Sequence, residues 1–239
     1  MDIQDQVALV TGANRGIGRT FVEELLARGA RKVYATARRP EAIDIPGVEV
    51  LRLDLTDPTS VTAAAEAAQD VTLVVNNAGI STGAALITGD MAEIRREMDT
   101  HFYGTLGVIR AFAPVLAANG GGGIVNILSA LSWFATLSSG SYSSAKAAEW
   151  NMTNGVRGEL ASQGTFVQGV LLGAADTDIS AGYDGPKIDP RDVPRLSLDG
   201  LSTGAIEVIV DDWTAMVKAS LSEDPAPFYK KINALLGAN

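Results

Sequence analysis

The segment TGANRGIG at residues 11–18 decides the fold of this chain. It follows the apolar run VALV at residues 7–10 and leads into a helical pattern over residues 17–28, which Gly29 ends. A run that is apolar at every position is typical of a strand buried on both faces of a parallel sheet. Glycines at this junction let the backbone turn sharply and approach a pyrophosphate, which the free N–H groups of the helix can bind. The segment therefore predicts a dinucleotide-binding turn, and a purely structural turn is the alternative.

The same alternation of strand and helix patterns continues along the chain. Further strands are predicted at residues 32–36, 48–53, 71–75, 124–128, 165–172 and 206–210, and helices at residues 57–68, 90–118, 143–162 and 192–201, with a helical tail. Pro114 is expected to kink or break the helix that contains it. Residues 176–191 are expected to form a surface excursion. This order predicts one α/β domain over residues 1–239, a Rossmann-type doubly wound parallel sheet of about seven strands flanked by helices.

Composition excludes several classes of protein. With 46% hydrophobic and 20% charged residues among 239, the chain can bury a core, which argues against disorder. It has no cysteine and a single histidine, so neither disulfides nor a thiolate or histidine metal site is expected. A net charge of −9 disfavours a nucleic-acid partner. The polar, acidic N-terminus and short apolar runs predict a cytoplasmic protein without a signal peptide or membrane span.

Three more motifs stand at the ends of predicted strands or at a helix start. NNAG occupies residues 76–79, Ser129 ends the fifth strand, and YSSAK occupies residues 142–146. Together with TGxxxGxG, they resemble the short-chain dehydrogenase/reductase family. The resemblance runs in register from about residue 7 to residue 177 and more loosely to the C-terminus.

Tyr142 and Lys146 are four residues apart, so they share one face of a helix. The ammonium group of Lys146 should lower the pKa of Tyr142, which makes Tyr142 a candidate general acid for carbonyl reduction and base for alcohol oxidation. The hydroxyl of Ser129 can donate to the substrate oxygen. The family spacing of thirteen residues to the tyrosine selects Ser129 over Ser132. The alternatives are a packed tyrosine ring, a solvated lysine and a serine that closes a turn.

The chain departs from the family pattern at two places. Where the family usually carries Asn-x-x-Gly in a proton relay, this chain has His101-Phe102-Tyr103-Gly104. His101 could keep the relay, because an imidazole both donates and accepts, or it could be a buried core histidine. Leu172-Gly173 replaces the family's Pro-Gly, which should leave the loop less rigid before a ligand binds.

The resemblance also implies which residues contact the cofactor. They are Gly12, Asn14, Arg15, Gly16, Ile17, Gly18, Arg38, Asp54, Leu55, Asn76, Ala78, Gly79, Tyr142, Lys146, Gly173, Ala175 and Thr177. In the family, the acidic residue at position 54 bonds the adenine amino group, the lysine bonds the nicotinamide ribose and the threonine at 177 lies at the carboxamide. Asp54 could instead cap a turn.

The cofactor is predicted to be NADP(H). NAD sites commonly carry Asp or Glu about 20 residues past the glycine motif, whereas this chain has Arg38-Arg39. An arginine can bind the 2′-phosphate with bidentate hydrogen bonds, and Arg15 could approach the same phosphate. Arg39 precedes Pro40 and should point away, which favours Arg38. The alternative is that both are solvated loop charges.

The predicted function is reversible reduction of an apolar aldehyde or ketone. The expected pocket is apolar, lined by Leu131, Trp133, Phe134, Leu137, Leu172 and Tyr183, with Arg191 and Arg195 outside it. Trp133 and Phe134 could instead belong to a packing or subunit interface. Two other functions stay open: a non-catalytic NADP(H)-binding regulatory module, and a lyase or epimerase on the same fold.

A homo-oligomer is expected, because family members usually pair through the helices after the fourth and fifth strands. Small and apolar residues on the helix that starts near Tyr142 could serve such an interface, namely Ala145, Ala147, Ala148, Trp150 and Met152. The segment Asp211-Asp212-Trp213 departs from the glycine-rich ending of tetrameric relatives, which favours a dimer.

Overall fold

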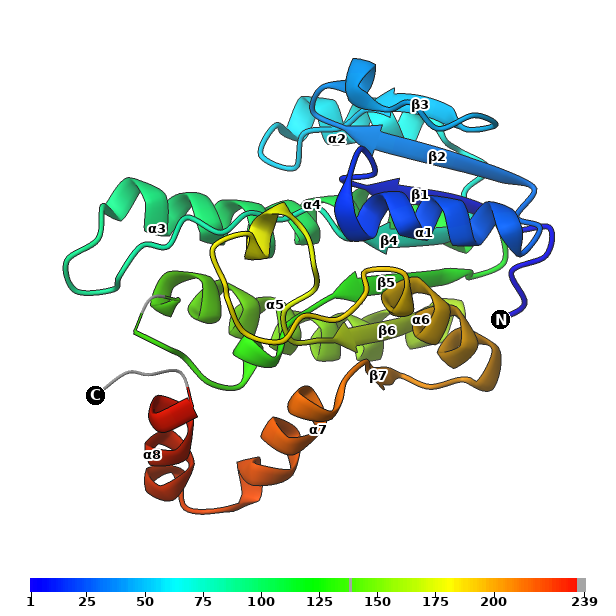
Figure 1. The fold of residues 1–239 in the computed structure, drawn as a ribbon. Helices are drawn as coiled ribbons and strands as arrows, with labels where there is room; N and C mark the ends of the chain where they lie inside the picture. Colours follow the sequence, from blue (N-terminus) through cyan, green and yellow to red (C-terminus); the bar gives the residue numbers. More distant parts are fainter. Residues whose placement is uncertain (138, 236–239) are drawn as a thin grey trace.

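The computed structural model describes residues 1–137 and 139–235. Within them, seven parallel strands form one sheet in the order β3-β2-β1-β4-β5-β6-β7 (Figure 1). The strands are β1 Val7–Thr11, β2 Lys32–Ala37, β3 Glu49–Arg52, β4 Leu73–Asn76, β5 Gly123–Ile127, β6 Phe166–Leu171 and β7 Glu207–Ile209. The predicted doubly wound parallel sheet is confirmed, and the predicted strand ends differ from the observed ones by at most two residues.

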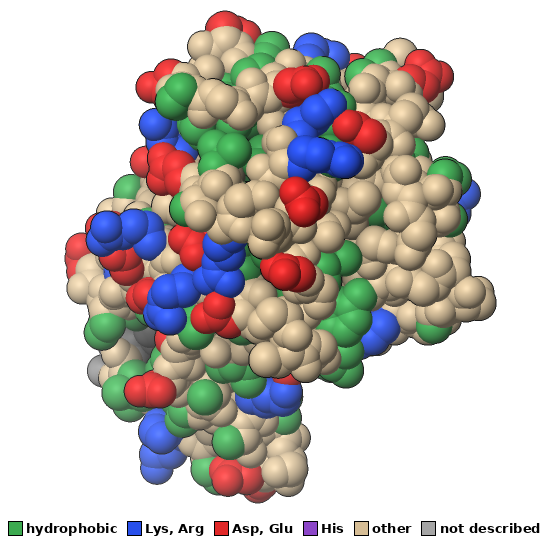
Figure 2. Space-filling view, turned by 90° about the vertical axis from the view of Figure 1, so that its right-hand side faces the viewer, with side chains coloured by type: hydrophobic (Ala, Val, Ile, Leu, Met, Phe, Trp, Pro, Cys, Tyr) green, Lys and Arg blue, Asp and Glu red, His purple; other side chains and the backbone are tan. Residues whose placement is uncertain are grey.

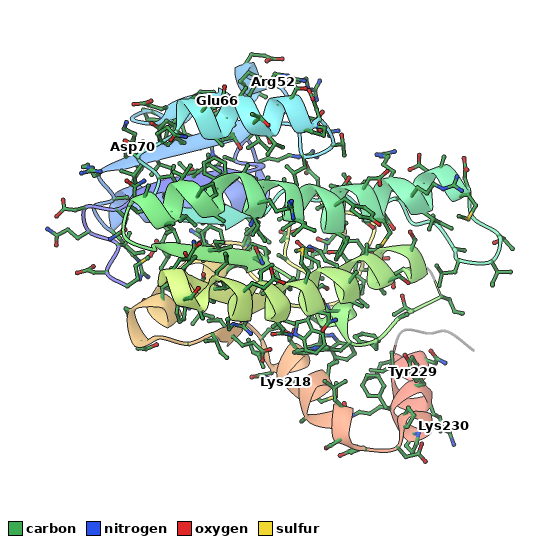
Figure 3. All side chains as sticks on the ribbon, turned by 180° about the vertical axis from the view of Figure 1, so that it is seen from behind. Arg52, Glu66, Asp70, Lys218, Tyr229 and Lys230 are labelled. Carbon is green, nitrogen blue, oxygen red and sulfur yellow. The ribbon has the colours of Figure 1, made fainter. Side chains whose placement is uncertain are left out.

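Helices cover both faces of the sheet. They are α1 Gly16–Ala27, α2 Pro58–Ala67, α3 Met91–Met98, α4 Thr105–Ala118, α5 Gly140–Leu160, α6 Asp192–Thr203, α7 Asp212–Ala219 and α8 Pro225–Leu235. Helices α1 and α6 pack together on one face. Helices α2, α4 and α5 lie side by side on the other, as Figure 3 shows from behind.

Two apolar layers hold the helices to the sheet. On one side, Phe21 of α1 and Leu198 of α6 are buried together with the side chains of β1 that point the same way. On the other, Val61 of α2, Phe112 of α4 and Val156 of α5 form the second layer. Because both faces are covered, every residue of β1 and β4 is buried. This is why the central strands read as continuous apolar runs in the sequence.

The sheet has its topological switch point between β1 and β4, where the strand order reverses. In open α/β sheets, a crevice for ligands forms there, beyond the carboxyl ends of the strands. The predicted excursion over residues 176–191 contains a short 3₁₀ turn, Asp178–Ser180, and crosses in front of the helices and the sheet (yellow in Figure 1). A bridge between Ala175 and Ile188 closes its base.

The helix predicted over residues 90–118 is interrupted, but at a different place from Pro114. Helix α4 continues through Pro114 to Ala118, so the prediction of a break there is wrong. Burial of Val115 and Leu116 beyond the proline offsets its missing N–H. The interruption is a π-helical segment, Asp99–Gly104, between α3 and α4. It contains His101, and such widened turns often occur at functional sites.

Helices α1 and α2 match their predicted ranges to within one residue, and α5 and α6 differ by more. Helix α5 begins at Gly140 rather than at residue 143, so Tyr142 lies in its first turn. Helix α6 extends two residues beyond the predicted end. The helical tail comprises α7 and α8, and residues 236–239 lie outside the described residues.

The surface carries charges of both signs close together. Figure 2 shows Lys and Arg side chains beside Asp and Glu side chains on one face. Surface ion pairs include those of Arg28 with Glu24 and Asp199. Among the residues described, no helix has the length and apolar character needed to cross a membrane.

Candidate active site

The glycine turn between β1 and α1 is packed too closely for larger residues. Gly12 and Gly16 have φ angles of +67° and +53°, which L side chains rarely adopt. A Cβ on Gly18 would stand 2.2 Å from the carbonyl oxygen of Gly12. Among the residues that the structure describes, no side chain caps the start of α1, so its first N–H groups stay available to an anion.

The NNAG segment after β4 is bound to this turn. The Nδ2 atom of Asn77 donates to the carbonyl oxygen of Thr11 at 2.9 Å, and the N–H of Ala78 donates to the Thr11 hydroxyl at 3.0 Å. Asn76 is different, because it is buried and donates to Asn126 at 2.9 Å. The predicted cofactor contact of Asn76 is therefore not supported, and Asn77, which the prediction omitted, lines the cleft instead.

One cleft of about 1030 Å³ gathers most of the predicted site. Its wall includes every residue predicted to contact the cofactor except Gly18 and Asn76. Gly18 is packed against Gly12 behind the turn, so its contribution is structural. The candidate catalytic residues Ser129, Tyr142, Lys146 and His101 all line the same cleft.

Ser129 ends the segment after β5 and begins a 3₁₀ turn, Ala130–Ser132. Its oxygen accepts from the N–H of Leu131 at 3.1 Å, which leaves its O–H free to donate. Ser132 is buried, bonds the N–H of Ser129 and is not among the residues that line the cleft. The structure therefore favours Ser129 over Ser132, as the sequence spacing does.

Tyr142 lies between groups of opposite charge. Burial raises the pKa of Tyr142, and the carboxylates of Glu149 and Glu97 raise it further, while the Lys146 ammonium and the Ser129 hydroxyl oppose the rise. Lys146 thus acts in the predicted direction, but the net shift is upward. A tyrosine in this state holds its proton at neutral pH, which suits a proton donor.

Lys146 is 5% exposed and bonds two acceptors inside the protein. Its Nζ donates to the carbonyl oxygen of Ile127 at 2.8 Å and to Oε2 of Glu149 at 2.7 Å. Burial lowers the pKa of Lys146, but Glu149 and Tyr142 outweigh that effect, and the net pKa is raised. The alternative of a solvated lysine is therefore excluded.

His101 is 1% exposed, and its ring meets that of Tyr142 edge to face, with centroids 5.3 Å apart. Its Nε2 lies 2.7 Å from the carbonyl oxygen of Ile80, and its Nδ1 lies 3.7 Å from Glu149. A Cβ on Gly79 would stand 2.6 Å from the imidazole, so glycine is needed there for His101 to fit. His101 is both a buried histidine and a wall of the cleft, so the two sequence interpretations are compatible.

The end of the cleft beside the glycine turn holds three arginines, Arg15, Arg38 and Arg39. Arg15 pairs with Asp178 across the cleft at 2.5 Å, an interaction that the sequence did not predict. Arg38 and Arg39 form no ion pair within residues 1–137 and 139–235. Asp54 accepts from the N–H and the hydroxyl of Thr56, so it does cap a turn while also lining the cleft.

The loop after β6 is fixed by an aspartate rather than by a proline. The N–H of Gly173 donates to Asp211 at 2.8 Å, and Asp211 also accepts from the N–H of Thr214 at the start of α7. A residue from a distant part of the chain thus binds the loop at the position next to the missing proline.

The far end of the cleft is largely apolar. Of the predicted lining residues, Leu131, Phe134, Leu137, Leu172 and Tyr183 are present, together with Trp213, Arg96 and Asn233, which the prediction omitted. The prediction that Trp133 lines the pocket is wrong, because Trp133 packs against Trp150, with ring centroids 6.2 Å apart, and does not line the cleft. Arg191 and Arg195 lie outside it, paired with Asp189 and Asp192.

Comparison with known proteins gives a consistent result. The family model for short chain dehydrogenases matches residues 6–185. An uncharacterized oxidoreductase from Staphylococcus saprophyticus is 31% identical over 84% of this chain and 93% of its own length.

Solved structures agree over the whole fold. A short chain dehydrogenase from Burkholderia cenocepacia in complex with NADP is 39% identical, has a TM-score of 0.91 and matches over 99% of both chains. A short-chain dehydrogenase from Sphingobium yanoikuyae in complex with NADPH is 26% identical, with a TM-score of 0.78 over 91% of this chain and 94% of its own. This chain, with its glycine turn, its NNAG segment and its Ser129, Tyr142 and Lys146 on one cleft, belongs to the short-chain dehydrogenase/reductase family of oxidoreductases.

Proposed function

We propose that this oxidoreductase reversibly reduces an apolar aldehyde or ketone with NADP(H), with Tyr142 as the general acid and base. The observation that supports this most is the shared cleft, which joins the glycine turn to Ser129, Tyr142 and Lys146. One cleft with these residues can hold a dinucleotide and a small substrate side by side.

The residues of the cleft fit such a cofactor. The turn over residues 12–18 has no room for a Cβ at Gly12 or Gly18 and leaves the start of α1 uncapped, as a pyrophosphate site requires. Lys146 uses two of its three donors inside the protein, so its third is available to a ribose hydroxyl. When bound, the nicotinamide cofactor would supply the hydride for reduction or accept it in oxidation.

The protein residues then handle the substrate oxygen. The hydroxyl of Tyr142 donates its proton to the carbonyl oxygen as that oxygen gains negative charge, and takes it back in the oxidation. The hydroxyl of Ser129 donates a hydrogen bond to the same oxygen. Both side chains line the cleft, and the Ser129 hydroxyl, which accepts from the N–H of Leu131, keeps its own O–H as a donor.

Preference for NADP(H) follows from charge at the cofactor end. Arg38 is exposed at the end of β2, on the wall of the cleft, and can bind a 2′-phosphate with bidentate hydrogen bonds. Relatives from Burkholderia cenocepacia and Sphingobium yanoikuyae are complexes with NADP and NADPH. Arg15 can join the same phosphate only after it leaves Asp178.

The apolar side chains at the far end of the cleft, such as Leu131, Phe134 and Leu172, support an apolar substrate, and Arg96 there is paired with Glu93. The test is an NADPH-linked screen of ketones and aldehydes of increasing size, with the alcohol products identified and their chirality measured. Consumption of NADPH with apolar ketones supports the proposal. Strict preference for phosphorylated or carboxylate substrates would reject it, and turnover of a substrate without net NADPH consumption would favour a lyase or epimerase.

We also propose that the protein forms a homodimer through α4 and α5, which lie side by side on one face (Figure 3). Ala147, Ala148 and Trp150 remain partly exposed for this contact, whereas Ala145 and Met152 are buried within the subunit and are withdrawn from the predicted interface. Light scattering at micromolar concentration tests this, and a monomer would refute it. Cytoplasmic localisation stays a prediction from composition.

A further inference from the structure

A buried carboxylate lies directly behind the proposed catalytic lysine. Glu149 is 1% exposed and lies three residues after Lys146 on α5. Its Oε2 accepts from Nζ of Lys146 at 2.7 Å. The mechanism proposed above assigns no role to Glu149, and a charged group so deeply buried needs compensating partners.

Three different elements supply those partners. Lys146 comes from the same helix, Thr105 donates from the start of α4 to Oε1 at 3.2 Å, and His101 approaches from the π-helical segment. His101 places Nδ1 3.7 Å from Oε2, and this nitrogen has no hydrogen-bond partner among the described residues. The widened turn at Asp99–Gly104 thus brings His101 over the same carboxylate.

The arrangement fixes where the lysine points. The carbonyl oxygen of Ile127 and the carboxylate of Glu149 bind two of the three N–H groups on Nζ. Lys146 lines the cleft beside Tyr142, so the remaining N–H of Nζ is available on that side. No other acidic side chain forms an ion pair with Lys146 in the part of the chain that the structure describes.

We propose that Glu149, supported by Thr105 and His101, is the counter-ion that holds the Lys146 ammonium beneath Tyr142. It is a positioning residue, because it acts through Lys146 and does not line the cleft. The effect of Glu149 on turnover rests on the proposed function, whereas its effect on the charge of Lys146 does not.

The proposal has a definite sign in pH. The groups that face Tyr142 and Lys146 are Glu149 on α5, Glu97 on α3, His101 on the π-helical segment and Ser129 after β5. Carbonyl reduction needs a protonated tyrosine and a charged lysine. Tyr142 and Lys146 titrate as a coupled pair, so the pair has a first pKa whichever residue loses the proton. Removing the negative charge of Glu149 lowers that first pKa.

The first experiment compares Glu149→Gln with the wild type in NADPH-dependent reduction across pH. The variant is expected to lose activity on the alkaline side at a pH lower by about 1–3 units, the usual effect of removing an opposite charge at this distance. Glu159→Gln removes the same charge from an exposed position of α5 and is the matched control. A purely structural role would lower the height of the profile without moving it.

The second experiment does not depend on turnover. Nitrogen-15 NMR of lysine-labelled apoprotein follows the charge on Nζ of Lys146, with the resonance assigned by Lys146→Arg. In Glu149→Gln this lysine should lose its proton at lower pH than in the wild type, and in Glu159→Gln at the same pH. An unchanged midpoint in Glu149→Gln overturns the proposal, even if the enzyme is active.

If the Lys146 titration midpoint shifts in Glu149→Gln but the wild type reduces no carbonyl compound, the proposed function is rejected and the proposed role of Glu149 as counter-ion is supported. If Glu149→Gln does not fold, Glu149→Asp is the variant that tests the proposal. This variant keeps the charge on a shorter arm, so the Lys146 midpoint should stay close to that of the wild type while kcat falls severalfold. A wild-type kcat in Glu149→Asp then overturns the proposal.

Discussion

Replacing Gly18 by alanine should distort the turn that is predicted to bind the cofactor phosphates. A Cβ at this position would stand 2.2 Å from the carbonyl oxygen of Gly12 and 2.5 Å from Nδ2 of Asn77. Non-bonded heavy atoms pack at about 3.5–4.0 Å, so one backbone segment has to move by roughly 1 Å. Forcing a methyl group into such packing costs about 1–3 kcal/mol. For a chain of this length, each kcal/mol lowers the melting temperature by about 2–4 °C.

The assay combines thermal unfolding by circular dichroism with a fluorescence titration of NADPH. Gly18→Ala should melt about 2–12 °C below the wild type and bind NADPH at least about tenfold more weakly. Gly155→Ala is the matched control: it lies inside α5 with no atom within 4 Å of the added Cβ. This control should bind NADPH normally and gain up to about 1 kcal/mol of stability. Wild-type melting and wild-type NADPH affinity in Gly18→Ala would refute the described packing of the turn.

Three other results are expected. Arg38→Asp should weaken NADPH binding by about 10- to 100-fold, since a charge-assisted hydrogen bond contributes about 1.5–3 kcal/mol, and it should shift the preference toward NADH. An equal or higher kcat/KM with NADH than with NADPH in the wild type contradicts the predicted role of Arg38. His101→Ala should lower kcat by about tenfold, the equivalent of one lost hydrogen bond, whereas His101→Asn should stay within a few-fold; unchanged activity in His101→Ala removes the relay role. Burial raises the pKa of Tyr142, so the rate of reduction should persist into the alkaline range and the rate of oxidation should rise there. A rate of reduction that already declines with rising pH below neutrality would be inconsistent with that shift.

The sheet was predictable because its strands carry their information locally. Strands buried on both faces, such as Val7–Thr11 and Leu73–Asn76, are apolar at nearly every position, and that pattern alone predicts a parallel sheet. The motifs at the strand ends then predicted which residues share one cleft. Helix ends were harder: Gly140 and Ser141 are weak helix formers, yet both are buried in the first turn of α5.

What the sequence did not predict depends on contacts between distant residues. The π-helical segment at His101 coincides with its bond to Ile80, and the fixed loop at Gly173 depends on Asp211. Asn76 is buried and bonds Asn126 on the neighbouring strand β5. Glu149 is the exception, because its spacing of three from Lys146 on a helix is a local signal that could have revealed the ion pair.

The most direct test of the proposed function is NADPH-dependent ketone reduction by the wild type and by Tyr142→Phe. Phenylalanine keeps the ring that packs against His101 but has no proton to donate. We expect kcat to fall by about 100-fold or more, the usual contribution of a general acid, while the dissociation constant for NADPH stays within a few-fold. Reduction by Tyr142→Phe at the wild-type rate, or a wild-type protein that binds NADPH but reduces no aldehyde or ketone, would contradict the account.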